Sequence, residues 1–161
     1  MPWSLPLAMA LCVAMVVLTV LVHYEGLRLI TDLVLPKIGV APRQEIIFVI
    51  LGVFLAHTIE VWLFAFSYGL STLTTLLGTF RGDLDGSLLD FMYFSATTYT
   101  SLGIGDVYPT GGMRLLTGVE ALVGLVMIGW SASFTYLIME RLWKIHGASH
   151  HGHPHNRPPE P

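Results

Sequence analysis

Three long apolar stretches restrict this chain to a membrane fold. Leu5–Val22, Ile46–Tyr68 and Leu115–Met139 are each long enough to cross roughly 30 Å of hydrocarbon as a helix. Hydrophobic residues make up 53% of the sequence and charged residues only 12%, which excludes an ordinary soluble domain. The sequence therefore predicts an all-α membrane protein with three transmembrane helices.

A fourth apolar segment, Leu88–Thr100, is too short to cross the membrane. We expect a re-entrant helix here, capped by Asp85 or Ser87 and ending near Thr98. Non-helical backbone is tolerated at membrane depth only where it is buried or lines water. The loop after the short helix must therefore satisfy one of these conditions.

That loop contains two alternating glycines, Gly103 and Gly105. Because glycine adopts backbone angles that a Cβ forbids, such a loop can turn successive carbonyl oxygens toward a common axis. A row of carbonyl oxygens can replace the water shell of a dehydrating cation. The loop therefore indicates a passage for cations.

The run Ser101–Asp106, with Val107-Tyr108-Pro109 after it, resembles the threonine–valine–glycine–tyrosine–glycine–aspartate filter of potassium channels. The chain is similar to small prokaryotic members with a two-helix pore module, preceded here by one additional transmembrane helix. The resemblance implies a re-entrant pore helix, a filter loop and a homotetramer in a lipid bilayer, since four loops surround each ion. It also implies an ion-binding filter made by Ser101, Leu102, Gly103, Ile104 and Gly105.

The permeant ion implied by the resemblance is potassium, with sodium left open. Ile104 stands where the family most often has tyrosine, so the phenol hydrogen bond that tethers the filter is absent. We therefore keep a non-selective cation channel or a sodium channel as the alternative. No cofactor and no nucleic-acid partner are expected, and the partners are monovalent cations, lipid and further copies of the chain.

Other residues are assigned supporting roles around the filter. Asp106 is expected to stand behind the outer mouth and accept hydrogen bonds, and Glu120 is expected to accept them from the pore helix or the filter backbone. Tyr99 and Thr100 complete the connection between helix and filter, and Thr98 and Thr100 are counted with the filter support. For gating, the candidates are Gly124, as a hinge or a helix-packing position, and Thr135.

Ser131, Thr135 and Ile138 share one face of the third span and are candidates to line the cavity below the filter. In the second span, His57 and Glu60 are spaced i, i+3 and share a helix face. A charge inside the bilayer is expensive, so this intramembrane polar pair is either a buried clamp between helices or a proton sensor. We favour the clamp.

Positive charges predict the orientation of the chain. The linker before the second span and the segment after the third are richer in lysine and arginine than the segment between the second and third spans. The N-terminus is therefore expected outside and the C-terminus in the cytoplasm of a multi-pass protein, which the resemblance suggests lies in a bacterial inner membrane. Within the first linker, Glu25, Arg28 and Asp32 lie opposite Leu29 on a helical pattern. Either the first helix extends beyond the bilayer or a short helix lies on the membrane surface.

The predicted organisation has three parts. Residues 1–45 form the first helix and an amphipathic linker, residues 46–143 form the pore module, and residues 144–161 form a tail rich in histidine and proline. His150, His151, His153 and His155 are weak candidates for binding a metal. Because the tail lacks cysteine or carboxylate partners at fixed spacing, we expect it to be disordered.

Two other function classes were weighed. Gly129-Trp-Ser131-Ala-Ser133 superficially resembles a serine-nucleophile turn, and His57 could serve as a base, as in an intramembrane serine hydrolase. The second glycine of that motif is missing, so the expectation is that the chain is not an enzyme. A regulatory membrane subunit that does not conduct by itself is the other alternative.

Overall fold

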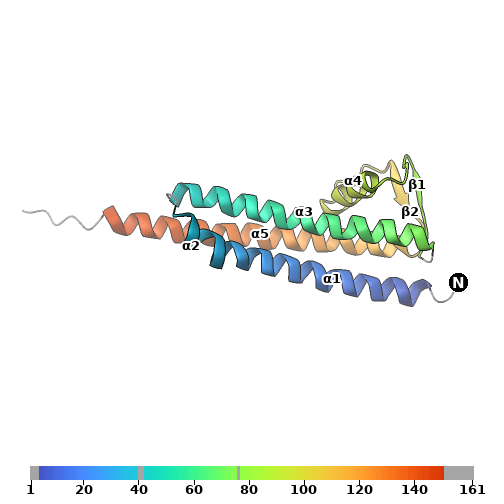
Figure 1. Ribbon diagram of the computed structural model, residues 1–161, viewed down its shortest axis with the longest axis horizontal. Coiled ribbons are helices and arrows are strands. Elements are labelled where there is room, and N and C mark those ends of the chain that lie inside the picture. Colours follow the sequence, from blue (N-terminus) through green and yellow to red (C-terminus); the bar gives the residue numbers. More distant parts are fainter. Residues whose placement is uncertain (1–3, 40–41, 76, 151–161) are drawn as a thin grey trace, which may run out of the picture.

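Three long helices form the body of the molecule (Figure 1). The computed structural model describes residues 4–39, 42–75 and 77–150. The long helices are α1 (Ser4–Leu29), α3 (Pro42–Thr74) and α5 (Met113–His150). Each belongs to a segment long and apolar enough to cross a membrane: Leu5–Lys37, Gln44–Thr74 and Met113–Lys144. The predicted all-α membrane architecture is confirmed, and every span is longer than its apolar stretch alone suggested.

The first helix continues past its apolar part without a break. A π-helical segment, Ile30–Val34, joins α1 to the short helix α2 (Leu35–Ile38). Arg28 lies 3.4 Å from a carboxylate oxygen of Glu25 and 3.5 Å from one of Asp32, and all three side chains are exposed. Since the charges pair along the helix surface, they extend the helix rather than end it. The linker is therefore helical up to Ile38.

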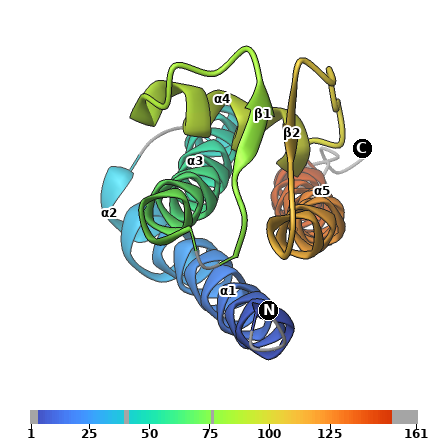
Figure 2. The same cartoon turned by 90° about the vertical axis from the view of Figure 1, so that its right-hand side faces the viewer.

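The re-entrant helix α4 (Leu88–Tyr99) packs against α3 and α5 at one end of the bundle (Figures 1 and 2). Figure 2 shows α1 on the opposite side of α3 and α5 from α4. The segment before α4 and the segment after the filter loop form a two-stranded antiparallel sheet, β1 (Phe80–Gly82) with β2 (Val107–Pro109). No alternating pattern in the sequence predicts this sheet. It ties the two ends of the re-entrant segment together.

An aromatic cluster fixes α4 on the bundle. The ring centroids of Phe80 and Phe94 lie 4.8 Å apart, and those of Tyr68 and Phe94 lie 5.3 Å apart in an edge-on arrangement. Tyr68, Phe91 and Phe94 are buried in one core cluster with residues of α1 and α5. Edge-to-face aromatic packing adds to the stabilisation from burial, so the re-entrant helix has a defined seat.

Candidate functional site

The N-terminus of α4 is fixed by a capping box. The Ser87 hydroxyl accepts a hydrogen bond from the Asp90 backbone N–H at 3.2 Å, and the Asp90 carboxylate accepts from the Ser87 backbone N–H at 3.0 Å. The same carboxylate accepts from the Asp85 N–H at 3.0 Å. These backbone hydrogen bonds, led by that from Ser87, lower the pKa of Asp90. Of the two predicted caps, Ser87 is the residue that caps the helix.

The C-terminus of α4 leads directly into the loop Ser101–Asp106. The Ser101 N–H donates to the Thr98 carbonyl at 2.8 Å, and the Gly103 N–H donates to the Thr97 carbonyl at 3.1 Å. The Thr100 hydroxyl donates back to the Ala96 carbonyl at 2.8 Å. The loop therefore starts from a fixed position at the end of the helix.

Backbone angles alternate along this loop. Ser101, Gly103 and Gly105 have φ values of +58°, +54° and +87°, whereas Leu102 and Ile104 between them are not in the positive-φ region. A positive φ is strained for a residue with a Cβ, so Ser101 is held there by its surroundings. Alternation of this kind turns successive peptide carbonyls toward the same side instead of opposite sides.

The exit of the loop is braced by Asp106. Its carboxylate accepts a hydrogen bond from the Tyr93 hydroxyl of α4 at 2.8 Å and from the Val107 N–H at 2.9 Å. Its backbone carbonyl accepts from the Asp83 N–H at 3.2 Å. The Asp106 carboxylate raises the pKa of Tyr93, so the phenol stays protonated and able to donate throughout the ordinary pH range.

Glu120 of α5 is completely buried and holds the middle of α4. One of its oxygens accepts from the Ser95 hydroxyl of α4 at 2.5 Å, and the other accepts from the Tyr68 hydroxyl of α3. The Ser95 hydroxyl also lies 2.9 Å from the Val61 carbonyl. This carboxylate therefore joins three helices, α3, α4 and α5.

Glu60 of α3 organises a second buried polar cluster, one turn further along α4. Its Oε1 lies 2.8 Å from His23 Nδ1 of α1, and its Oε2 accepts from the Tyr99 hydroxyl. The Nδ1 of His57 lies 2.9 Å from the Tyr99 oxygen and 3.3 Å from Glu60 Oε2. His57 and Glu60, the predicted pair, are thus brought together as part of a larger group.

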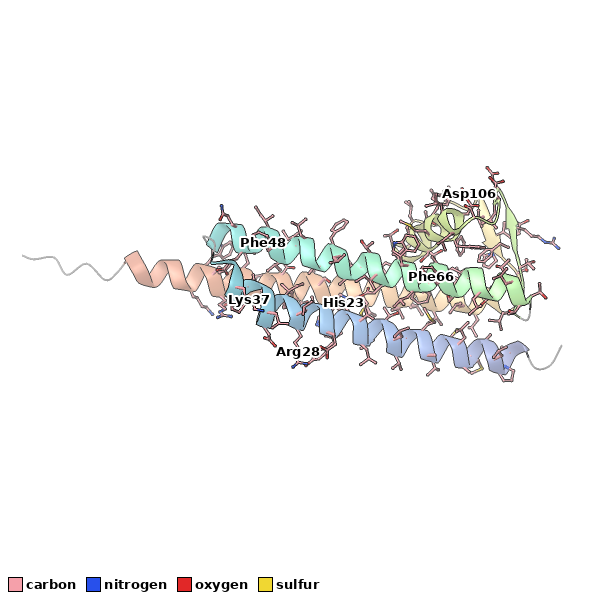
Figure 3. The ribbon with its side chains drawn as sticks, in the orientation of Figure 1. His23, Arg28, Lys37, Phe48, Phe66 and Asp106 are labelled. Carbon is pink, nitrogen blue, oxygen red and sulfur yellow. The ribbon has the colours of Figure 1, made fainter. Side chains whose placement is uncertain are left out.

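Ser131 of α5 closes this group from the other side. Its Oγ lies 3.2 Å from His23 Nε2 and 3.0 Å from His57 Nε2. The side chains of His23, His57, Glu60, Tyr99 and Ser131 therefore form a closed circuit that we call the buried ring. His23 also packs against Trp130, with ring centroids 5.2 Å apart, and Figure 3 shows His23 in the middle of the bundle.

Two chemistries must be considered for the buried ring. His23, His57 and Glu60 each offer one possible ligand atom, and these atoms lie within 4.8 Å of one another, as a metal site requires. Each of these atoms, however, already has a hydrogen-bond partner inside the ring. These contacts fit hydrogen bonding without an ion.

The contacts Ser131–His57–Glu60 also follow the order of a nucleophile, a base and a carboxylate. Ser131 lies in the interior of α5, where backbone N–H groups donate within the helix and cannot bind a developing oxyanion. Its hydroxyl is buried and shared by two imidazoles. The geometry therefore offers a hydroxyl beside a base but no donors for an oxyanion, and acyl transfer needs both.

Comparison with known proteins supplies the family. A family model described as an ion channel matches residues 46–141, which is more than half of the chain. This chain belongs to that ion-channel family. No curated protein and no solved structure matches it significantly. The match begins at α3, so α1, which contributes His23 to the buried ring, precedes the matched part of the channel.

The two gating candidates lie at different kinds of position in the channel. A Cβ on Gly124 would overlap the backbone carbonyl of Tyr99, so α5 passes closest to the end of the pore helix at this glycine. Helix α5 continues unbroken through Gly124. Thr135 is half-buried and lines an apolar groove of about 700 Å³ between α3, α4 and α5.

Of the two other residues on this face of α5, Ser131 lines the same groove as Thr135, whereas Ile138 is buried against other helices. Ser131 is buried in the ring, and Ile138 packs with Leu27 of α1 and Val49 of α3. The extra helix α1 lies against this face of α5, which the two-helix pattern of the family did not predict. Their side chains therefore hold the subunit together.

Two basic side chains and one acidic side chain lie toward opposite ends of the bundle (Figure 3). Figure 3 shows Arg28 and Lys37 toward the end away from the filter loop, and Asp106 at the opposite end. The N-terminal part of α1 lies at the same end as the sheet (Figure 1). Of the tail histidines, His151, His153 and His155 lie outside the described residues, and the side chain of His150 is not among those described.

Several residues of the site were missed by sequence reasoning. They are hydroxyl and imidazole groups that complete the two buried carboxylates and the loop brace: His23, Tyr68, Tyr93, Ser95 and Tyr99. For His23 a signal existed, because it is an ionisable residue directly after an apolar run, and the true span extends well beyond it. For the hydroxyl groups, no pattern in one sequence distinguishes a buried partner from an exposed one.

Proposed function

We propose that this chain is the subunit of a tetrameric, potassium-conducting channel with passive permeation through the loop Ser101–Gly105. Four loops would surround a central axis, and the carbonyls of Ser101, Leu102, Gly103 and Ile104, with the Ser101 hydroxyl, would take the place of the ion's water. The observation that carries the proposal is the alternation of positive φ at Ser101, Gly103 and Gly105 at the end of a re-entrant helix. Membership of the ion-channel family supports it.

The surroundings of the loop also favour cations. The C-terminal end of a helix carries partial negative charge, and α4 ends directly before the loop. Asp83, Asp85 and Asp106 lie near the other end of the loop, in the segments that flank β1 and β2. An acidic mouth raises the local concentration of cations. Both features support cation permeation, and neither distinguishes potassium from sodium.

We further propose an orientation with the filter mouth and the N-terminus outside and the C-terminal end of α5 in the cytoplasm of a bacterial inner membrane. The positions of Arg28 and Lys37, at the end of the bundle away from Asp106, support it (Figure 3). Short loops on the cytoplasmic side of a membrane protein carry an excess of lysine and arginine. Accessibility of single cysteines placed at either end to an impermeant thiol reagent tests this orientation.

The decisive test of conduction is Gly103→Ala in liposomes loaded with potassium. An added Cβ at φ +54° is strained, so the carbonyls on either side must rotate and flux should fall by at least about tenfold. Gly86→Ala is the matched control, since Gly86 also has a positive φ of +80° with open space around it but lies before the pore helix. It should conduct normally. Full flux in Gly103→Ala with intact assembly contradicts the proposal.

Selectivity is measured in the same liposomes with potassium on one side and sodium on the other. A potassium channel gives a reversal potential close to that of potassium. The non-selective or sodium channel gives one near zero or near that of sodium. The second possibility draws support from Ile104, whose side chain is 57% exposed in the single chain and offers no hydroxyl to brace the loop.

An intramembrane serine hydrolase remains the second candidate, because Ser131, His57 and Glu60 are in contact. A fluorophosphonate probe labels an activated serine and leaves an ordinary buried hydroxyl unmodified. We expect no labelling of Ser131 in protein that conducts potassium. Labelling that disappears in Ser131→Ala would establish the hydrolase instead.

A further inference from the structure

The buried ring has more hydrogen-bond contacts than hydrogens. Its circuit runs from Glu60 to His23, Ser131, His57 and Tyr99 and back to Glu60, with one contact between each pair of neighbours. Each of these five contacts requires one hydrogen. The Tyr99 and Ser131 hydroxyls supply one each, two neutral imidazoles supply one each, and an ionised carboxylate supplies none. The circuit is therefore one hydrogen short.

One added proton completes the circuit in either of two ways. If the Nε2 of one histidine takes the proton from water, that imidazole becomes an imidazolium and donates to Ser131, and Ser131 donates to the other imidazole. Held by Glu60 instead, it lets every member of the ring donate once and accept once. Both forms have no net charge, whereas the form without the proton leaves one negative charge inside the bilayer. A buried, incompletely bonded charge is costly, which favours the proton-bound form.

We propose that the buried ring is a binding site for one exchangeable proton, and that occupancy of this site keeps the filter conducting. The inference rests on the proposed channel function, because its physiological readout is flux. The ligand is a proton, delivered from water. The site joins α1, α3, α4 and α5, so losing the proton weakens a contact that all four helices share.

The structure offers an access route from the groove to the buried ring and a direct connection from the ring to the loop Ser101–Asp106. His57 is the most exposed member of the ring, with 19% of its side chain accessible, and it lies in the wall of the groove between α3, α4 and α5. Tyr99 is the last residue of α4, and its backbone carbonyl is pressed against Gly124. The strained Ser101 follows two residues later. Movement of Tyr99 therefore reaches the filter directly.

Other titratable groups near the ring do not supply the missing hydrogen. Glu120 of α5 reaches the same pore helix one turn earlier and is itself bonded to Ser95 and Tyr68. Beyond His23 on α1, Glu25 and Arg28 are exposed and pair with each other. On the remaining side His23 meets the indole of Trp130.

Proton binding is tested without reference to flux. The sequence contains seven histidines, of which five lie in the tail. Replacing these five by glutamine leaves His23 and His57 as the only imidazoles, and ¹⁵N-histidine NMR in liposomes then reports the ring alone. Spectra recorded between about pH 5 and 8 should show one pH-dependent change that both residues share. The same change should persist in Gly103→Ala, which separates this proposal from the conduction proposal.

The effect on conduction is tested by flux over the same pH range, again with the tail histidines replaced. Flux should fall by about tenfold as pH rises. Glu60→Gln mimics the proton-bound ring, because an amide both donates and accepts, so its flux should stay high at every pH. Ser131→Ala removes both contacts of Ser131 and its hydrogen, so the neutral groups fill the contacts that remain without an added proton. The midpoint of its flux–pH curve should therefore move down by about one pH unit.

Ser133→Ala is the matched control on the same helix. Ser133 is exposed and its hydroxyl donates to the Gly129 carbonyl of its own helix, outside the ring. Its pH profile should equal that of the parent. Independent titration of the two histidines, a pH response that vanishes with the tail histidines, or loss of flux at all pH values in Glu60→Gln would each overturn the proposal. So would NMR titration that appears only after a chelator has removed a bound metal ion.

Discussion

Hydroxyl groups of a single short helix attach it, and the loop Ser101–Asp106 that follows it, to the rest of the chain. Three side chains of α4 each donate to a carboxylate from another part of the chain. The three pairs are Tyr93 with Asp106, Ser95 with Glu120, and Tyr99 with Glu60. Helix α4 is thus held by separate acids at two positions in its middle and at its C-terminal end.

The attachment of Tyr93 to Asp106 predicts a change in selectivity. Tyr93→Phe removes the hydroxyl that donates to Asp106 at 2.8 Å but keeps the ring, so the exit of the loop loses one brace. A hydrogen bond to a charged group contributes about 1.5–3 kcal/mol. We expect sodium permeability relative to potassium to rise by roughly tenfold, measured by reversal potentials.

Tyr108→Phe is the control for that substitution. Tyr108 lies on β2 close to the loop, but 52% of the residue is exposed, so loss of its hydroxyl should leave selectivity unchanged. Equal behaviour of the two variants would mean that the Tyr93 hydroxyl does not brace the filter.

Residue by residue, the sequence was most informative where the backbone itself carries the chemistry. Gly103 and Gly105 require positive φ, and both have it. The polar partners of Glu60 were predictable only within its own helix, because the i, i+3 spacing of His57 is local. His23 is 37 residues away in sequence, and only the packing of α1 brings it to Glu60.

Among the elements, α4 and α5 approach closely where Gly124 meets Tyr99. Gly124 allows the Tyr99 carbonyl to lie where a side chain would otherwise stand. Small residues permit such close approach between membrane helices. This geometry supports helix packing for Gly124, and it leaves a hinge role as a prediction.

A comparison of two glycines of α5 tests the packing role. Gly124→Ala should lower the free energy of unfolding by about 1–3 kcal/mol, because the added methyl displaces the backbone of Tyr99. Gly118→Ala, on the same helix with open space around the glycine, should raise it by about 0.5–1 kcal/mol. Thermal or denaturant unfolding in detergent measures both. If Gly124→Ala is as stable as Gly118→Ala, the close contact does not constrain the channel.

Element types were predictable, and their ends were less so. Apolar runs indicate the part of a helix inside the bilayer, whereas α3 begins at Pro42 and ends at Thr74, well outside its apolar run. Proline at the first helical position explains that start. The sheet of β1 and β2 was missed because strands of three residues carry no detectable alternation, and their pairing depends on the loop between them.

At the scale of the whole molecule, the additional helix α1 contributes a side chain to the buried ring and covers one side of the bundle (Figure 2). It covers the side of α3 and α5 opposite the pore helix (Figure 2). Without α1, His23 would be missing and the buried face of Ile138 would be uncovered. The apolar side chains of Leu102 and Ile104 are exposed in the single chain, as expected if further subunits pack behind each loop.

The number of subunits follows from mixing conducting and non-conducting chains. If four loops complete each ion site, one Gly103→Ala subunit distorts the whole site. Random assembly from equal amounts of wild type and Gly103→Ala then leaves about one channel in sixteen with four intact loops. Potassium flux at constant total protein should fall to that fraction of the wild-type value. A dimer would retain about one quarter, and independent pores about one half. Mixing with Gly86→Ala should leave flux nearly unchanged, because that glycine lies outside the loop. A decrease proportional to the mutant fraction would contradict the tetramer, and with it the shared ring of carbonyls.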